Sequence, residues 1–104
     1  MDIVEFLTER IKEDEAAARK LLKDRSVSES GKWYERRLLL ECEVKKRLIG
    51  IMVRARESAL TSMVSDPDGD GQWIPQSIGW MSESLNVLAL PYYDHPDFEQ
   101  DWLR

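Results

Sequence analysis

Residues 33–64 read WYERRLLLECEVKKRLIGIMVRARESALTSMV, a stretch with no proline and a single glycine, Gly50. Its apolar residues recur at steps of three and four, which is the period of an α-helix. One apolar stripe consists of Leu40, Val44, Leu48, Ile51 and Ala55, and a second, broader set consists of Leu38, Cys42, Ile49, Met52 and Met63. The pattern predicts one long central helix whose apolar surface is wider than a single neighbouring helix can cover.

Two further segments carry the same helical period on either side of this stretch. Residues 2–25 predict an amphipathic N-terminal helix, and residues 78–90 predict a third helix. The side chains expected to point inward from the third helix are Trp80, Met81, Leu85, Leu88 and Ala89. A short fourth helix is expected over residues 96–102, with Asp94 or His95 as its N-cap.

Polar residues leave some local choices open. Ser26 with Glu29 fits a capping box before the long helix, and Ser28 or Ser30 could cap it instead. Asp14 falls within the apolar stripe of the N-terminal helix. It lies either at the edge of the stripe in water, or buried and paired with a basic residue of the next helix.

The expected fold class is all-α, because no stretch alternates with the period of two that a strand requires. A chain of 104 residues is expected to form one domain. We therefore expect a small helical domain over residues 1–104. In it, the long central helix packs against the N-terminal helix and two shorter C-terminal helices.

Residues 65–72 read as a loop rich in aspartate and glycine. The loop begins like a calcium-binding loop, in which alternating carboxylates precede a glycine. Positions 1, 3, 5, 6 and 7 of such a loop would be Asp66, Asp68, Asp70, Gly71 and Gln72. Position 12 is Ser77, which cannot supply the closing bidentate carboxylate, and Pro75 favours an extended segment over residues 73–76. We expect an acidic turn, with no metal site and no cofactor.

The formal net charge of −5 is unevenly distributed along the chain. Residues 35–56 contain seven basic and three acidic residues, whereas residues 57–104 contain nine acidic residues and one basic residue. The basic segment from Arg36 to Arg56 makes a nucleic-acid-associated function the alternative to protein binding. The overall acidity argues against strong non-specific binding to nucleic acid, so nucleic acid is the less favoured partner.

The chain contains one cysteine, Cys42, so no internal disulfide is expected and a reducing cytoplasm fits. Residues 1–6 lack the basic start of a signal peptide. No apolar run approaches the roughly 20 residues of a membrane span. We therefore expect a cytoplasmic protein with no membrane partner.

No group of residues predicts catalysis. Cys42 and His95 could form a thiol nucleophile and its base, with Asp94 or Asp97 orienting the base. Cys42 lies within an apolar stripe of a helix, however, where a small buried thiol is ordinary. We expect a protein that is not an enzyme and has no catalytic residues.

The C-terminal tail, residues 85–104, places aromatic side chains among acidic ones and is too apolar for a disordered end. An interaction patch is predicted from Tyr92, Tyr93, Asp94, His95, Asp97, Phe98 and Trp102. Aromatic anchors with a charged rim are typical of protein interfaces, and the alternative is that the aromatic rings pack in the core. Tyr92 and Tyr93 are adjacent, so at least one of them is expected to face solvent or a partner.

Three segments resemble a family of small actinobacterial and actinophage proteins of unknown function. They are FLTERIKEDEAAAR (residues 6–19), LECEVKKRLI (residues 40–49) and the tail, in which LALPYYDHPD (residues 88–97) is the most specific part. Residues 53–79 match nothing in that family. The resemblance implies an origin in an actinobacterium or one of its phages. It implies no activity, cofactor or functional residue.

The long helix also predicts a homodimer. Leu38, Leu39 and Leu40 are consecutive and point in three directions, so part of this apolar surface is expected to stay uncovered and to mark an interface. The contact residues expected in a two-fold dimer are Leu38, Leu39, Ile49 and Met52. An antiparallel dimer would bring residues 45–47 near acidic groups of the other chain, and the alternative is a monomer in which residues 73–90 cover the far side. The expected function is non-enzymatic protein–protein interaction, for example by a phage product that binds a host protein.

Overall fold

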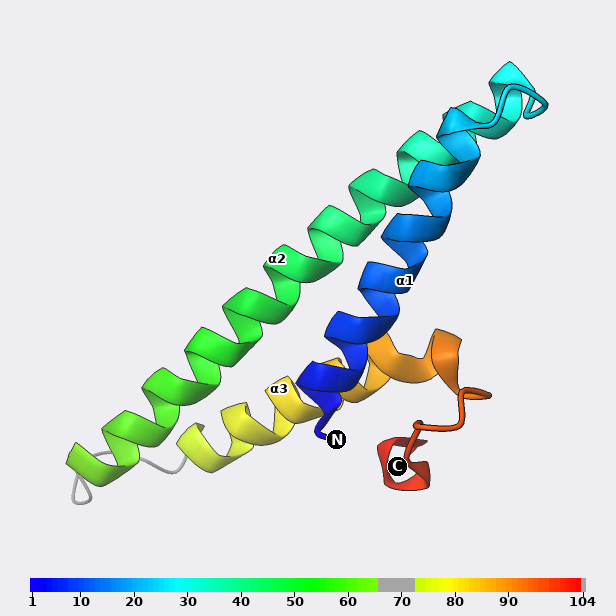
Figure 1. The fold of residues 1–104 in the computed structure, drawn as a ribbon. Coiled ribbons are helices and arrows are strands. Elements are labelled where there is room, and N and C mark those ends of the chain that lie inside the picture. Colours follow the sequence, from blue (N-terminus) through cyan, green and yellow to red (C-terminus); the bar gives the residue numbers. More distant parts are fainter. Residues whose placement is uncertain (66–72, 104) are drawn as a thin grey trace.

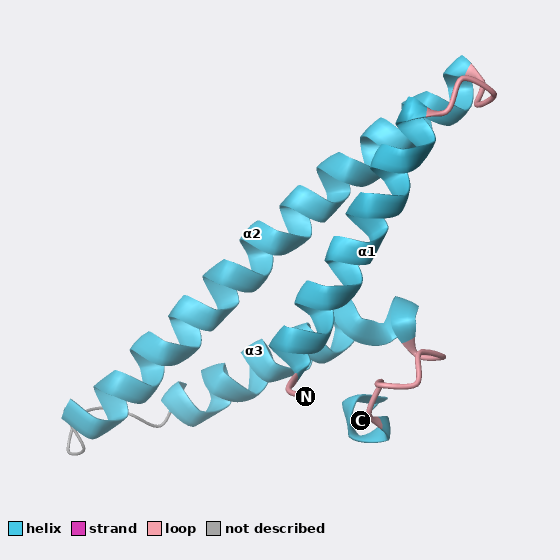
Figure 2. Cartoon of the chain, in the orientation of Figure 1, coloured by secondary structure: helices cyan, strands magenta, loops and turns pink. Residues whose placement is uncertain are grey.

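The computed structural model describes residues 1–65 and 73–103, and these ranges are helical without a β-strand. The α-helices are α1 (Ile3–Lys23), α2 (Glu29–Ser65) and α3 (Trp73–Ala89), and the 3-10 helices are η1 (Leu90–Tyr92) and η2 (Gln100–Leu103). α1 and α2 form an antiparallel hairpin, and α3 starts near the far end of α2 and crosses behind α1 (Figure 1). The prediction of an all-α fold with a long central helix is confirmed, as the predominance of helix in Figure 2 illustrates.

Short polar side chains fix the starts of the first two helices. The Asp2 carboxylate accepts a hydrogen bond from the Glu5 N–H at 2.8 Å and caps α1. α2 begins at Glu29, earlier than predicted, and the Ser28 hydroxyl accepts a hydrogen bond from the Gly31 N–H at 3.1 Å. The Ser26 N–H donates instead to the Asp24 carboxylate at 2.8 Å, so the capping box with Ser26 is wrong and Ser28 is the cap.

α3 includes the segment that Pro75 was expected to hold extended. The helix begins at Trp73, which places Pro75 in the first turn. The N–H groups of a first turn have no partner within the helix, so a proline costs no hydrogen bond there. The prediction of an extended segment over residues 73–76 is therefore wrong.

In the C-terminal tail, tight turns lead into the 3-10 helix η2, where the sequence predicts a fourth helix over residues 96–102. The N–H groups of Tyr93, His95 and Phe98 donate to carbonyls three residues earlier, at 2.9–3.1 Å. Pro91 and Pro96 have no N–H and cannot take part in a continuous α-helical ladder. A short C-terminal helix is present as η2 (Gln100–Leu103), but the predicted start at residue 96 and the cap by Asp94 or His95 are wrong.

The core lies where α1, α2, α3 and the tail meet. Its buried side chains are Phe6, Leu7, Ile11, Cys42, Ile49, Met52, Leu85, Ala89 and Phe98. On α3, Leu85 and Ala89 point inward as predicted, whereas Trp80 is 58% exposed and that prediction is wrong. α2 has 37 residues and α1 has 21, so the molecule is elongated, with extents of 63 × 24 × 18 Å.

Candidate functional site

Exposed apolar side chains lie in a row along α2 and continue on the adjoining α3. Leu40, Val44 and Ile51 on α2 are 65%, 57% and 54% exposed, and Val87 on α3 is 56% exposed. The exposed apolar residues Leu40, Val44, Leu48, Ile51, Trp80 and Val87 are called the α2–α3 face below. The face includes most of the first apolar stripe that the sequence predicts, whereas the second set supplies the buried residues Cys42, Ile49 and Met52.

This distribution corrects the predicted dimer contacts. Ile49 and Met52 are buried in the core and Leu38 and Leu39 are half-buried, whereas Leu40 is exposed. Both apolar stripes have similar composition, and α1 and α3 pack against the second one. Ile49 and Met52 are only 6% and 8% exposed, so they offer little surface to another chain.

Trp80 stands between two hollows along the junction of α2 and α3, each of about 400 Å³. One hollow is lined by Leu48, Met52, Trp80, Glu83, Ser84, Val87 and Leu88. The other is lined by Ala55, Ser58, Ala59, Ser62, Ile74, Ser77, Trp80 and Met81. Both linings are mainly apolar, so they suit aliphatic or aromatic side chains of a bound chain.

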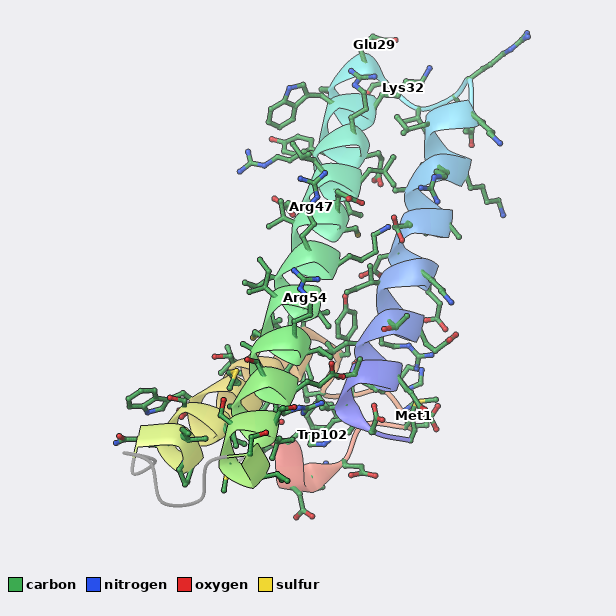
Figure 3. All side chains as sticks on the ribbon, turned by 90° about the vertical axis from the view of Figure 1, so that its left-hand side faces the viewer. Met1, Glu29, Lys32, Arg47, Arg54 and Trp102 are labelled. Carbon is green, nitrogen blue, oxygen red and sulfur yellow. The ribbon has the colours of Figure 1, made fainter. Side chains whose placement is uncertain are left out.

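Basic residues border the face along one side of α2. Arg47 and Arg54 are seven residues apart and lie one above the other along the helix (Figure 3). Arg47 pairs with Glu43 at 3.1 Å. Arg54 is exposed and has no ion pair among the residues that the structure describes. This side of α2 therefore carries both paired and unpaired charges beside the apolar face.

Three of the seven basic residues predicted as a nucleic-acid surface, Arg37, Lys46 and Arg47, pair with neighbouring acids. Arg37 contacts Glu41 at 3.2 Å, and Lys46 contacts the Glu15 carboxylate at 3.0 Å. The remaining basic residues of the segment, Arg36, Lys45 and Arg56, range from exposed to half-buried. Ion pairs of this kind lower the local potential available to a phosphate backbone.

The residues predicted as an interaction patch in the tail are divided between the core and the surface. Phe98 is buried, and the rings of Tyr92, Phe98 and Trp102 pack around Phe6, with centroid separations of 4.9–6.2 Å. Tyr93 is exposed, as the adjacency of the two tyrosines predicts. The alternative of core packing therefore holds for Tyr92, Phe98 and Trp102. Asp94, Asp97 and Tyr93 form the exposed part of the predicted patch.

Across residues 1–104 the chain matches a family described as a family of unknown function, DUF6221. The chain belongs to this family. No curated protein and no solved structure matches the chain. The fold and surface of this DUF6221 chain are therefore the basis for what can be inferred about its activity.

Arg10 joins α1 of this DUF6221 chain to the tail, a role that the sequence did not reveal. The guanidinium is buried, lies 5.2 Å from the centre of the Phe6 ring and contacts the Glu13 carboxylate at 3.0 Å. Its Nη1 contacts both ring nitrogens of His95 and lies 3.9 Å from the Asp97 carboxylate. The Asp97 N–H donates a hydrogen bond to His95 Nδ1 at 3.0 Å. The backbone of the tail therefore also holds the imidazole ring that contacts Arg10.

Two carboxylates on α1 have partners from other elements. Glu15 is buried and accepts a hydrogen bond from Lys46 on α2, and hydrogen bonds to Glu15 and Glu43 raise the pKa of Lys46. Asp14 is half-buried and accepts a hydrogen bond from the Tyr92 hydroxyl at 2.6 Å. The sequence predicts Asp14 either in water or paired with a basic residue of the next helix, and neither alternative includes Tyr92. The residue that pairs with a basic residue of α2 is Glu15.

The residue considered as a catalytic nucleophile, Cys42, lies in the core. Cys42 is fully buried in the core, and burial raises the pKa of its thiol, which opposes formation of a nucleophilic thiolate. Among the residues in these ranges, no cluster of three or more His, Cys, Asp or Glu side chains could hold a metal ion. None of the helices described combines the length and apolar character needed to cross a membrane.

The possible calcium loop lies outside the described residues, apart from Ser77. Ser77 is within α3, which begins at Trp73. The expectation that Pro75 holds residues 73–76 extended, which counted against a calcium loop, is therefore wrong. The objection that Ser77 has no carboxylate still applies.

Proposed function

We propose that this protein is a non-enzymatic interaction protein that binds another protein through the α2–α3 face. The observation that carries the proposal is the concentration of large apolar side chains on this face, where Leu40 and Trp80 are more than half exposed. Contiguous apolar surface on a small soluble domain usually marks a binding site. The adjoining hollows provide places for the side chains of the bound chain.

The polar groups around the face support a protein partner more than a nucleic acid. A nucleic-acid surface requires several free cations facing the phosphates. Here Arg37, Lys46 and Arg47 contact acidic side chains, and the exposed centre of the face is apolar. Protein interfaces combine such an apolar centre with a charged rim.

The proposed setting is the cytoplasm of a bacterial cell. The tail motif LALPYYDHPD, which resembles actinobacterial and actinophage proteins, is the basis for this setting. A free, buried Cys42 is compatible with a reducing compartment. In a phage context the bound protein would belong to the host.

A bait experiment tests the function. Tagged wild-type protein and the Trp80→Glu variant are incubated with actinobacterial lysate, and the bound proteins are quantified by mass spectrometry. Ala17→Glu is the control, because Ala17 is an exposed residue of α1 outside the face. We expect one or more proteins to be enriched by the wild type and the control and lost with Trp80→Glu.

Identical recovery with all three baits would overturn the role of the face. Enrichment of nucleic acid by the bait, falling steeply between low and high salt, would favour the alternative function of nucleic-acid binding. Circular dichroism of each bait confirms that the helical fold is intact. A measured turnover on a small molecule would contradict the non-enzymatic part of the proposal.

A further inference from the structure

We propose that the α2–α3 face binds a second copy of this chain, forming a two-fold dimer with antiparallel α2 helices. The inference rests on the proposed function, because it names a partner for the same surface. Three features of the described residues support it: the part of α2 that α3 leaves uncovered, the size of the face, and the order of charges along its edge.

The first feature is the incomplete cover that α3 gives to α2. The α2 residues that line the two hollows with α3 run from Leu48 to Ser62. Leu40 and Val44 precede this region and are exposed, and Trp80 is exposed on α3. An antiparallel partner would place its own Leu40 near Trp80 and its Val44 beside the two-fold axis, and the axis would repeat these contacts. Each copy would thus cover the apolar surface that the other leaves open.

A parallel arrangement fits this geometry less well. Each α3 lies beside the C-terminal half of its own α2. In a parallel pair, the two α3 helices would meet each other at one end of the dimer. They would keep the exposed apolar residues Leu40 and Val44 of the two α2 helices apart. The antiparallel arrangement alternates α2 and α3 helices and closes a compact bundle.

The second feature is the size of the face. From Trp33, which is also exposed, to Ile51 the helix extends about 27 Å at roughly 1.5 Å per residue. α3 adds a second helix to the width of the face only from Leu48 onward. A patch of this length offers several turns of helix against which a partner helix can pack.

The third feature is the charge order along the edge of α2. Arg47 pairs with Glu43 at 3.1 Å, one turn earlier in the same helix. In an antiparallel two-fold pair the same edge meets itself in reverse order, so Glu43 faces Arg47 of the partner subunit. The four charges would alternate in sign around the axis. Such reciprocal pairs favour one orientation of two helices over another.

The mass in solution is the first test. Light scattering at micromolar concentration should give about twice 12.2 kDa for the wild type, and 12.2 kDa for Leu40→Glu. The control Ala17→Glu should remain a dimer. Since Leu40 is 65% exposed, its substitution should leave the helical circular dichroism spectrum unchanged. A wild-type mass of 12.2 kDa across this range would overturn the inference.

Disulfide cross-linking tests the orientation. With Glu43 facing Arg47 of the partner subunit, the two-fold axis passes beside residue 45, so Leu40 lies next to Ile51 of the partner subunit and about 15 Å along the helix from the second Leu40. In this antiparallel dimer, the double variant Leu40→Cys/Ile51→Cys should form covalent dimers under mild oxidation, whereas Leu40→Cys alone should not. The wild type supplies the background, because its single cysteine, Cys42, is fully buried. Covalent dimers with Leu40→Cys alone would show that the helices are parallel and overturn the proposed arrangement.

The two proposals can fail separately. A wild-type monomer whose lysate partners are still lost with Trp80→Glu would end the dimer inference and leave the proposed function standing. The opposite result is a dimer that dissociates with Leu40→Glu while Trp80→Glu recovers the same lysate proteins as the wild type. This result would support the dimer and contradict binding of a different protein at this face.

Discussion

The Tyr92 hydroxyl donates a hydrogen bond of 2.6 Å to the Asp14 carboxylate, joining residues 78 positions apart in the sequence. Tyr92 ends η1 and Asp14 lies in the middle of α1, so this bond fixes the start of the tail to the first helix. Both side chains are half-buried, which strengthens the bond relative to one in water.

Removal of that hydroxyl should destabilise the protein. Tyr92→Phe keeps the ring beside Phe6 but leaves the half-buried Asp14 carboxylate without its donor. We expect the free energy of unfolding in urea to fall by about 1–2 kcal/mol, because the lost bond involves a charged acceptor. Tyr93→Phe is the matched control, because Tyr93 is exposed and should show no change. Equal effects for the two variants would contradict a specific role for Tyr92.

The same residue predicts a dependence on alkaline pH. Burial, followed by the hydrogen bond to Asp14, raises the pKa of Tyr92. Unfolded tyrosine loses its proton near pH 10, while the folded protein keeps it. The contribution to stability is therefore complete below about pH 10 and declines as pH rises further. The free energy of unfolding of the wild type should fall more steeply from pH 9 to 11 than that of Tyr92→Phe, and parallel curves would refute the assignment.

The buried carboxylate of Glu15 makes a second prediction. Lys46→Met removes the closest cation, and the remaining one, Arg19, lies 3.6 Å away. The melting temperature should fall by several degrees, because a buried charge loses its partner. The double variant Glu15→Leu/Lys46→Met should recover most of the loss, since it removes both charges. Calorimetry compares the three proteins, and a double variant less stable than Lys46→Met would exclude this explanation.

Replacement of Arg10 should reveal what its guanidinium contributes. In Arg10→Met an apolar chain replaces the stem beside Phe6, and the carboxylates of Glu13 and Asp97 stay solvated because both are exposed. In Arg10→Lys a buried ammonium loses the flat stacking that a guanidinium provides. Arg10→Met should therefore be more stable than Arg10→Lys by about 1 kcal/mol in urea unfolding. The reverse order would mean that the positive charge, and not the packing, holds the tail.

Phe6 should control the docking of the tail. Its ring is fully buried and contacts the rings of Tyr92, His95, Phe98 and Trp102. Phe6→Leu should lower the free energy of unfolding by about 1–2 kcal/mol, because it removes part of the buried volume. Hydrogen exchange should speed up in residues 93–103 more than in the middle of α2. A uniform increase over the whole chain would show that Phe6 serves the global core and not the tail in particular.

The helical period of the sequence was enough to predict three helices and the fold class, because the repeat of apolar residues is a local property. Which stripe of α2 faces inward could not be predicted in the same way. Leu40 and Cys42 both belong to apolar stripes, and only the positions of α1 and α3 make one exposed and the other buried. The helical period of residues 78–90 predicts that Trp80 points inward, whereas its exposure depends on where α3 lies against α2.

The candidate site was predicted less well, because its parts depend on long-range contacts. Pairs such as Arg10 with His95 join residues 85 positions apart, and no local pattern signals them. The turns of the tail depend on tertiary contacts as well as on Pro91 and Pro96. The aromatic residues of the tail were recognised, but their packing around Phe6 follows from α1 lying beside them.

The elongated shape that α2 gives the molecule affects how it moves in water. With extents of 63 × 24 × 18 Å, the molecule is more than twice as long as it is wide. A rod-like particle meets more friction in water than a sphere of equal mass, so it diffuses more slowly and tumbles faster about its long axis than end over end. N–H bonds along α2 lie nearly parallel to that axis, so their nuclear spin relaxation should report the slow end-over-end motion.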